Sequence, residues 1–268
     1  MSERITLGLI GGGNMAEAIA RAALDHELVM ASHMVMADPV AERRAVFEGM
    51  GIETSADNGA VVSVADHVML AIKPQTLGEI AGDLQQIDER QIVMSIMAGV
   101  TTHRIEEVIG KEARVIRIMP NTPLLVGQGM SAIALGRHAH MGDEVLAMGI
   151  FQSAGEAALL GEELLDAVTA VSGSGPAYLF YLAEAMAEAA RDLGLKGKLP
   201  EVLTRQTLLG AAQLLSDSDE SAAELRRRVT SPGGTTEAAI THMDKSKMKA
   251  VVGNAIRKAE QRSRELGK

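Results

Sequence analysis

The chain has 268 residues, of which 47% are hydrophobic and 23% charged, an ordinary globular composition that excludes a disordered chain. Its formal net charge of −9 disfavours binding to nucleic-acid phosphates, and the lack of cysteine excludes disulfides and thiolate metal sites. No apolar stretch reaches the roughly 20 residues of a membrane span, and no signal peptide is recognisable. We therefore expect a cytoplasmic protein with neither nucleic-acid nor membrane partners.

The first half of the chain alternates short apolar runs with helical segments. Residues Ile5–Ile10 are predicted to form a buried strand, Met15–Leu24 a helix and Met34–Ala37 a second strand. The next predicted strands are Val68–Ile72, Ile92–Ile96, Val115–Met119, Ser131–Leu135 and Ala157–Leu160. Helices between them are expected near Gln75–Gln85, Thr102–Ile109 and Asp143–Ser153. This alternation is typical of an α/β domain with a doubly wound parallel sheet.

Beyond Gly161 the strand pattern stops and the sequence is predicted to be helical. The expected helices span about Ser174–Leu193, Leu199–Leu215, Ala222–Arg228, Thr235–Met243 and Lys245–Leu266. Small and apolar residues fall on more than one face of these helices, although so short a unit has little interior of its own. We therefore expect two domains, residues 1–161 and residues 162–268, the second of which buries apolar faces against another subunit.

A glycine-rich turn directly follows the first predicted strand. Gly11, Gly13 and Ala16 have the G-x-G-x-x-G/A spacing, in which the first glycine permits a tight turn, the second lets the backbone approach a pyrophosphate, and the third residue allows close helix packing. The phosphates are expected at the helix N-terminus, where free N–H groups and the macrodipole favour anions. The pattern predicts a dinucleotide site, and the alternative is a glycine-rich turn without a ligand.

Asp38 ends the second predicted strand, where an acidic side chain can accept hydrogen bonds from an adenosine ribose. Taken alone, it favours NAD over NADP. Arg43 and Arg44 follow within two helical turns, however, and a guanidinium there can meet a 2′-phosphate while Asp38 only caps the helix. These residues leave the cofactor preference open.

Three further segments follow the carboxyl ends of predicted strands, the edge at which open α/β sheets bind ligands. They are Lys73-Pro74, Ala98-Gly99 and Pro120-Asn121-Thr122-Pro123, and we expect them to converge on one cleft. For Lys73 the alternative is a surface lysine that only fixes a loop.

Two segments of the helical half have the composition of ligand-binding helix starts. In residues 172–178, Ser172 and Ser174 can cap a helix, and Pro176 suits its first turn. In residues 230–237, paired glycines free the backbone so that N–H groups and threonine hydroxyls can surround a carboxylate. The second segment is predicted to bind an anion, and the alternative is an ordinary capped turn.

Taken together and in this order, the motifs of the chain resemble those of pyrroline-5-carboxylate reductases. The segments that carry the resemblance are Ile10-Gly11-Gly12-Gly13-Asn14-Met15-Ala16, Ile72-Lys73-Pro74, Met119-Pro120-Asn121-Thr122-Pro123, residues 166–178 and residues 228–236. The resemblance implies an N-terminal Rossmann domain with a doubly wound sheet, followed by an all-α C-terminal dimerisation domain. It further implies a homodimer that can assemble into a decamer.

The same resemblance implies a reaction and its site. An enzyme of this family reduces 1-pyrroline-5-carboxylate to L-proline, the last step of proline biosynthesis, with NADP(H) as cofactor and NAD(H) as the alternative. The substrate would contact Glu162, Gly234, Thr235 and Thr236, of which Thr236 is the catalytic residue because its hydroxyl would hydrogen-bond the ring nitrogen. The dinucleotide would contact Gly11, Gly12, Gly13, Asn14, Met15, Asp38, Asn58, Ala71, Ile72, Lys73, Pro74, Met97, Ala98 and Gly99.

Other functions fit the sequence less well. A hydroxy-acid dehydrogenase of similar architecture needs a general base, supplied by a lysine on the first long helix of its second domain, and residues 176–191 contain no lysine. A nucleotide-binding regulator without catalysis would not need the intact segment 231–236. His138 and His140 have no cysteine partners, and we expect a solvated loop there and no metal site.

Overall fold

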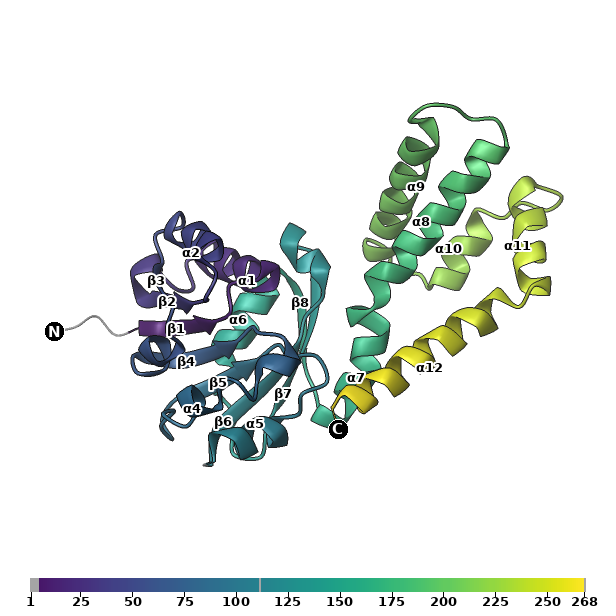
Figure 1. Cartoon of the computed structure of the whole chain (residues 1–268). Coiled ribbons are helices and arrows are strands. Elements are labelled where there is room, and N and C mark those ends of the chain that lie inside the picture. Colours follow the sequence, from purple (N-terminus) through teal and green to yellow (C-terminus); the bar gives the residue numbers. More distant parts are fainter. Residues whose placement is uncertain (1–4, 111, 268) are drawn as a thin grey trace. The chain divides into compact units, whose positions relative to one another are not determined.

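The computed structural model describes residues 5–110 and 112–267, which divide into two compact units (Figure 1). The first unit lies within the ranges 1–174 and 258–268, and the second comprises residues 175–257. The boundary predicted after residue 161 separates the strands from the helices that follow them, whereas the compact units divide later, after Ser174.

Among the described residues, the first unit contains an eight-stranded sheet in the order β3-β2-β1-β4-β5-β6-β7-β8. The strands are β1 (Ile5–Ile10), β2 (Met34–Ala37), β3 (Glu53–Ser55), β4 (Ala65–Leu70), β5 (Ile92–Ser95), β6 (Arg114–Met119), β7 (Gly129–Leu135) and β8 (Gly155–Leu159). The strand order reverses between β1 and β4, and open α/β sheets bind their ligands at such a switch point. The predicted doubly wound sheet is thereby confirmed.

One strand pair departs from the parallel arrangement that the sequence predicted, because β7 runs antiparallel to β6. Only residues 120–128 join these strands, including the 3-10 helix η3 (Thr122–Val126). A parallel connection needs a crossover of about a dozen residues or more, so this short link returns the chain in the opposite direction. The next connection contains α6 (Val145–Ser153), and β8 is again parallel to β7.

The elements between β2 and β4 were predicted only in part, as a helix after Asp38 that carries Arg43 and Arg44. These elements are α2 (Ala41–Glu48), the edge strand β3 and α3 (Asn58–Val62). The three residues of β3 are polar, so no apolar run marks the strand. The helix predicted near Gln75–Gln85 is divided into η2 (Pro74–Thr76) and α4 (Ala81–Leu84), in a segment where Gly78 and Gly82 lower helix propensity.

Helices cover both faces of the sheet and give it two cores. On one face, α1 (Asn14–Asp25), α2 and α6 pack against a cluster that includes Leu7 and Leu9, both fully buried. On the other face, α3, α4 and α5 (Thr102–Ile109) pack against Ile10 and its neighbours. Neighbouring β1 side chains such as Leu9 and Ile10 therefore pack in opposite cores, which explains why the strand is mainly apolar. The burial of each such large side chain contributes about 1.5–3 kcal/mol.

After β8 the chain becomes helical, as expected beyond Gly161, and it begins with short turns for which no range was predicted: η4 (Glu162–Leu164), α7 (Leu165–Val168) and a π-helical turn, η5 (Thr169–Gly173). The second unit then contains α8 (Gly175–Asp192), α9 (Leu199–Ser216), α10 (Ala222–Arg228) and α11 (Thr235–Lys245). Helix α12 (Met248–Leu266) begins in the second unit, and its last turns belong to the first. The predicted all-α second half is confirmed. Across the described ranges, we find no helix with both the length and the apolar character that a membrane crossing requires.

The second unit exposes large apolar side chains, including two aromatic side chains on α8. Phe180 is 69% exposed and Tyr181 75%. Further exposed apolar residues of this unit are Leu179, Val202, Leu203, Leu209, Leu214, Leu215 and Val251. So many exposed large apolar side chains in one small unit agree with the predicted subunit interface.

His67 on β4 is expected to make the stability of the first unit depend on pH. Burial lowers its pKa below the usual histidine value, against the opposing effect of a hydrogen bond with the Thr6 carbonyl at 3.1 Å. The unfolded chain therefore binds the proton first, so stability is complete above the unfolded pKa and falls as the pH drops below it. Urea unfolding between pH 7 and 5 gives the free energy of unfolding as a function of pH. For His67→Gln, this free energy should fall less steeply with decreasing pH than in wild type, by up to about 1.4 kcal/mol per pH unit. An unchanged slope would contradict this role.

Candidate active site

The glycine-rich turn after β1 has a backbone that only glycine adopts readily. Gly11 has φ +96°, and its N–H donates to the carbonyl of Ala37 at 2.8 Å. A Cβ at this position would lie 2.7 Å from the carbonyl oxygen of Ala71. Gly11 thus packs β1 tightly between the ends of β2 and β4, as its place in the motif predicts.

The N-terminus of α1 is open. Gly13 occupies the N-cap position in an extended conformation, and no side chain caps the helix. Gly13 and Asn14 are exposed, and a Cβ on Gly13 would meet no atom within 4 Å. Because the first turn of a helix presents N–H donors and the positive end of the macrodipole, this empty approach fits the pyrophosphate of a dinucleotide.

Asp38 lies next to this turn and is bound by the backbone. Its Oδ2 accepts from the N–H of Gly12 at 2.7 Å, and its Oδ1 accepts from the N–H of Val40 at 2.8 Å. The carboxylate thus holds the turn that leads into α2 but does not cap that helix, whose N-cap is Val40 without a side-chain cap. It remains half-buried beside the glycines, where it can face a ribose.

The two arginines of α2, Arg43 and Arg44, also lie beside the glycine-rich turn and Asp38. Arg43 donates to the carbonyl of Gly12 and forms an ion pair with Glu17 at 2.9 Å. Hydrogen bonds from Arg43, and then from Arg21, hold the pKa of Glu17 below its usual range. Arg44 donates to the carbonyl of Asp38 at 2.8 Å. Both an acidic group and guanidinium groups therefore lie beside the glycine-rich turn, near the expected position of the ribose.

The strand ends that follow the turn lie side by side at the same edge. The N–H of Ala71 donates to the carbonyl of Ile10 at 2.8 Å, and the N–H of Ile96 donates to the carbonyl of Leu70 at 3.1 Å. The predicted residues Ala71, Ile72, Lys73, Pro74, Met97, Ala98 and Gly99 therefore gather at the carboxyl edge of β4 and β5. Asn58, at the start of α3, donates to Asp83 at 3.0 Å.

Gly99 is packed against the C-terminal end of α12. It has φ +78°, and a Cβ there would lie 2.9 Å from the Cβ of Leu266 and 3.3 Å from the backbone nitrogen of Gly267. Gly99 is therefore required by a close approach within the first unit, a contact that the sequence did not predict.

In the second unit, Gly234, Thr235 and Thr236 form the start of α11. Gly234 is the N-cap, with no side-chain cap, and Gly233 before it has φ +71°. The N–H of Gly233 donates to Glu237 at 2.8 Å, which closes the turn. Thr235 is exposed and Thr236 half-buried. This second uncapped helix start has the geometry expected of an anion-binding turn.

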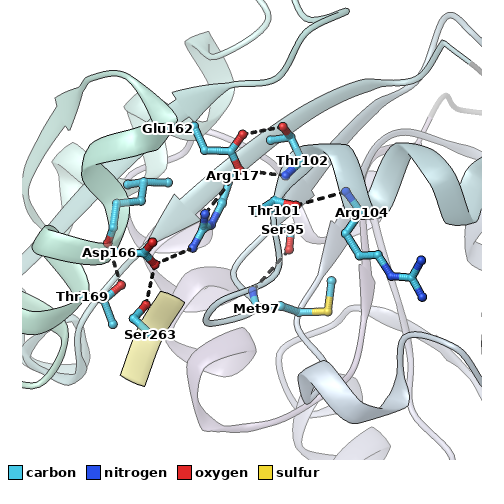
Figure 2. A network of polar contacts seen from close by, with 11 residues as sticks. Ser95, Met97, Thr101, Thr102, Arg104, Arg117, Glu162, Asp166, Thr169 and Ser263 are labelled. Carbon is cyan, nitrogen blue, oxygen red and sulfur yellow. Dashed lines mark hydrogen bonds and ion pairs between the residues drawn. The ribbon is translucent and has the colours of Figure 1, made fainter. Parts of the chain in front are cut away.

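Glu162 belongs to a polar network of the first unit (Figure 2). Its carboxylate accepts from the N–H of Thr102 at 2.8 Å and from the Thr102 hydroxyl at 2.6 Å, and Arg117 on β6 lies 3.3 Å away. Asp166 lies 3.8 Å from Arg117 and accepts from the Ser263 hydroxyl at 2.6 Å. Of this network, only Glu162 was expected at the site. Arg117 carried one signal, a lone charge inside an otherwise apolar run.

Comparison with known families agrees with both halves of this architecture. Residues 162–266 match the model described as pyrroline-5-carboxylate reductase dimerisation. Residues 6–99 match the model described as NADP oxidoreductase, coenzyme F420-dependent.

Full-length relatives are found in distant organisms. A pyrroline-5-carboxylate reductase of Synechocystis sp. is 38% identical over 265 residues, which cover 98% of this chain and 99% of the relative. That of Pseudomonas aeruginosa is 41% identical over 263 residues, covering 97% and 96%.

Solved structures show the same fold. A pyrroline-5-carboxylate reductase of Coxiella burnetii has a TM-score of 0.90 at 34% identity, with 99% of this chain and all of the other covered. The Plasmodium falciparum pyrroline carboxylate reductase with NADP bound has a TM-score of 0.88 at 27% identity, with both chains fully covered. The chain therefore belongs to the pyrroline-5-carboxylate reductases, NAD(P)H-dependent oxidoreductases that reduce 1-pyrroline-5-carboxylate to L-proline.

Proposed function

We propose that the dinucleotide of this reductase binds at the glycine-rich turn and at the carboxyl edge of β4 and β5. The observation that carries the proposal is the open, uncapped N-terminus of α1. The N–H groups there would hold the pyrophosphate, and Asp38 would face the adenosine ribose. The other contacts are assigned to Gly11, Gly12, Gly13, Asn14, Met15, Asn58, Ala71, Ile72, Lys73, Pro74, Met97, Ala98 and Gly99.

The substrate is assigned to the start of α11. The N–H groups of Gly234 and Thr235 would hold the carboxylate, since an uncapped helix N-terminus favours an anion. Thr236 is assigned as the catalytic residue, because its hydroxyl would form a hydrogen bond with the ring nitrogen. Glu162 is assigned to the substrate as well, because a carboxylate accepts about four hydrogen bonds and so has capacity beyond its donors Thr102 and Arg117.

The chemistry that this chain must supply is modest. Bound NAD(P)H supplies the hydride for the C=N carbon. A protonated imine is already electrophilic, so the residues of the chain have to fix the ring in the correct orientation and exclude water. This explains why a hydrogen-bonding threonine suffices where an alcohol substrate would need a general base.

We further propose a cytoplasmic homodimer that assembles into a decamer, with residues 1–161 as the dinucleotide-binding domain and residues 162–268 as the substrate-binding and dimerisation domain. Support for the subunit interface comes from the exposed apolar faces of the second unit. A groove of about 700 Å³ between α8 and α9 is lined by Leu179, Phe180, Ala183, Ala187 and Leu208 among others. The oligomer would cover such apolar surface.

The proposed function is tested by measuring the oxidation of NADPH and of NADH in the presence of 1-pyrroline-5-carboxylate. The loss of absorbance of the reduced dinucleotide reports the reaction. We expect turnover with NADPH, and the formation of proline measured in the same samples. A wild-type protein that is inactive with both dinucleotides would overturn the proposal.

Asp38→Ser is expected to shift the cofactor preference toward NADPH. Serine removes a negative charge that repels a 2′-phosphate, and its shorter side chain also withdraws the carboxylate oxygen that accepts from the N–H of Gly12. We expect the ratio of kcat/KM for NADPH to that for NADH to rise by about tenfold, equivalent to roughly 1.4 kcal/mol. Asp25→Ser, at the other end of α1, is the matched control. An unchanged ratio would limit Asp38 to capping the turn.

A further inference from the structure

A buried arginine joins two segments that are far apart in the sequence. Arg117 lies on β6 with its side chain only 4% exposed, and it forms ion pairs with Glu162 at 3.3 Å and Asp166 at 3.8 Å. Burying the guanidinium charge costs free energy, which the two carboxylates offset. Conversely, removing the guanidinium would leave both carboxylates without their cationic partner. Each carboxylate in turn holds a different segment (Figure 2).

The first branch runs to the start of α5. Glu162 binds the N–H and the hydroxyl of Thr102, the first residue of that helix. Thr101, the N-cap, accepts from the N–H of Arg104 at 3.2 Å. The loop Met97–Thr101 ends at this helix start, so Glu162 fixes the position at which the loop enters α5.

The second branch runs to the end of α12. Asp166 accepts from the hydroxyl of Ser263, whose residue is 4% exposed, across 97 positions of sequence. One turn later, Leu266 and Gly267 lie against Gly99, in the middle of the same loop. The loop is thus held from both sides, by Glu162 at its end and by the end of α12 at its centre.

We infer that Arg117 is a positioning residue for the dinucleotide-binding loop Met97–Thr101, acting through Glu162 and through Asp166 with Ser263. The inference deepens the proposed function and rests on it, because Met97, Ala98 and Gly99 are the residues assigned to the dinucleotide. Arg117 itself contacts neither reacting group. A displaced loop would weaken dinucleotide binding without changing the start of α11.

The test measures the Kd of NADPH by titration of its fluorescence on the full-length protein, together with KM and kcat. Arg117→Lys keeps the charge but loses the guanidinium fork that spans both carboxylates, so we expect the Kd and KM for NADPH to rise about tenfold. Because Glu162 is also assigned to the substrate, the readout specific to the loop is Ser263→Ala, for which the KM for 1-pyrroline-5-carboxylate at saturating NADPH should remain within about twofold of wild type. Ser263→Ala cuts only the second branch and should raise the Kd by about threefold.

Arg104→Met is the matched control, because Arg104 lies on α5 beside the same loop, 60% exposed, and pairs with Glu107 outside the network. Its Kd should equal that of wild type. Ser263→Ala keeps the inference testable should Arg117→Lys fail to fold. Folded variants that bind NADPH as tightly as wild type, with only a lower melting temperature, would overturn the inference alone. A wild type that binds neither dinucleotide would overturn the proposed function, and the inference with it.

Discussion

Thr236→Ala is expected to lower kcat with 1-pyrroline-5-carboxylate by about 100-fold or more, the usual loss when one hydrogen bond to the reacting group is removed. Thr236 lies half-buried in the first turn of α11, two positions after the uncapped N-cap Gly234. Without the hydroxyl, the ring nitrogen loses the partner that orients the C=N carbon. The Kd of NADPH should remain nearly unchanged, since the glycine-rich turn belongs to the other compact unit.

Two further variants separate the hydroxyl from the general effect of shortening a side chain on this helix. Thr236→Ser retains a hydroxyl and should recover most of the turnover. Thr241→Ala removes an exposed hydroxyl from the same helix and should behave as wild type. Full activity of Thr236→Ala would refute the catalytic role of Thr236, and equal losses in Thr241→Ala would point to a disturbed helix instead.

The fold was predictable where a pattern of apolar residues is local and strong. Strands β2 and β5 and most of β1 are buried on both faces, so these strands consist mainly of apolar residues. The polar edge strand β3 has no such run and was missed. The direction of β7 was also missed, because an apolar run does not encode direction. That information lay in the short connection between β6 and β7.

The candidate site shows the same division between local and distant information. The glycine-rich turn could be predicted because Gly11 and Gly13 act through the backbone of a single strand-to-helix turn. The Arg117 network could not, since Arg117 and Glu162 are 45 positions apart and Asp166 and Ser263 are 97 apart. No spacing rule connects such residues, and only the fold brings them together.

Gly13→Ala is expected to raise the Kd of NADPH by about 100-fold or more while the protein stays folded. An alanine suits the backbone there, with φ −68° and ψ 175°, and its Cβ would meet no protein atom within 4 Å. The Cβ would instead occupy the space through which a pyrophosphate approaches the helix N-terminus. Since alanine is a poorer N-cap than glycine, the free energy of unfolding should fall by no more than about 1 kcal/mol.

Gly11→Ala, two positions earlier, is the informative comparison. Its φ of +96° and the carbonyl oxygen of Ala71 at 2.7 Å from the new Cβ predict a stability loss of at least about 1–3 kcal/mol. Fluorescence titration and thermal unfolding should therefore separate the two variants, because Gly13→Ala should lose NADPH binding with little loss of stability, whereas Gly11→Ala should lose stability as well. Tight NADPH binding by folded Gly13→Ala would contradict the assignment of the α1 N-terminus to the pyrophosphate. It would mean that a Cβ at position 13 does not obstruct the bound dinucleotide.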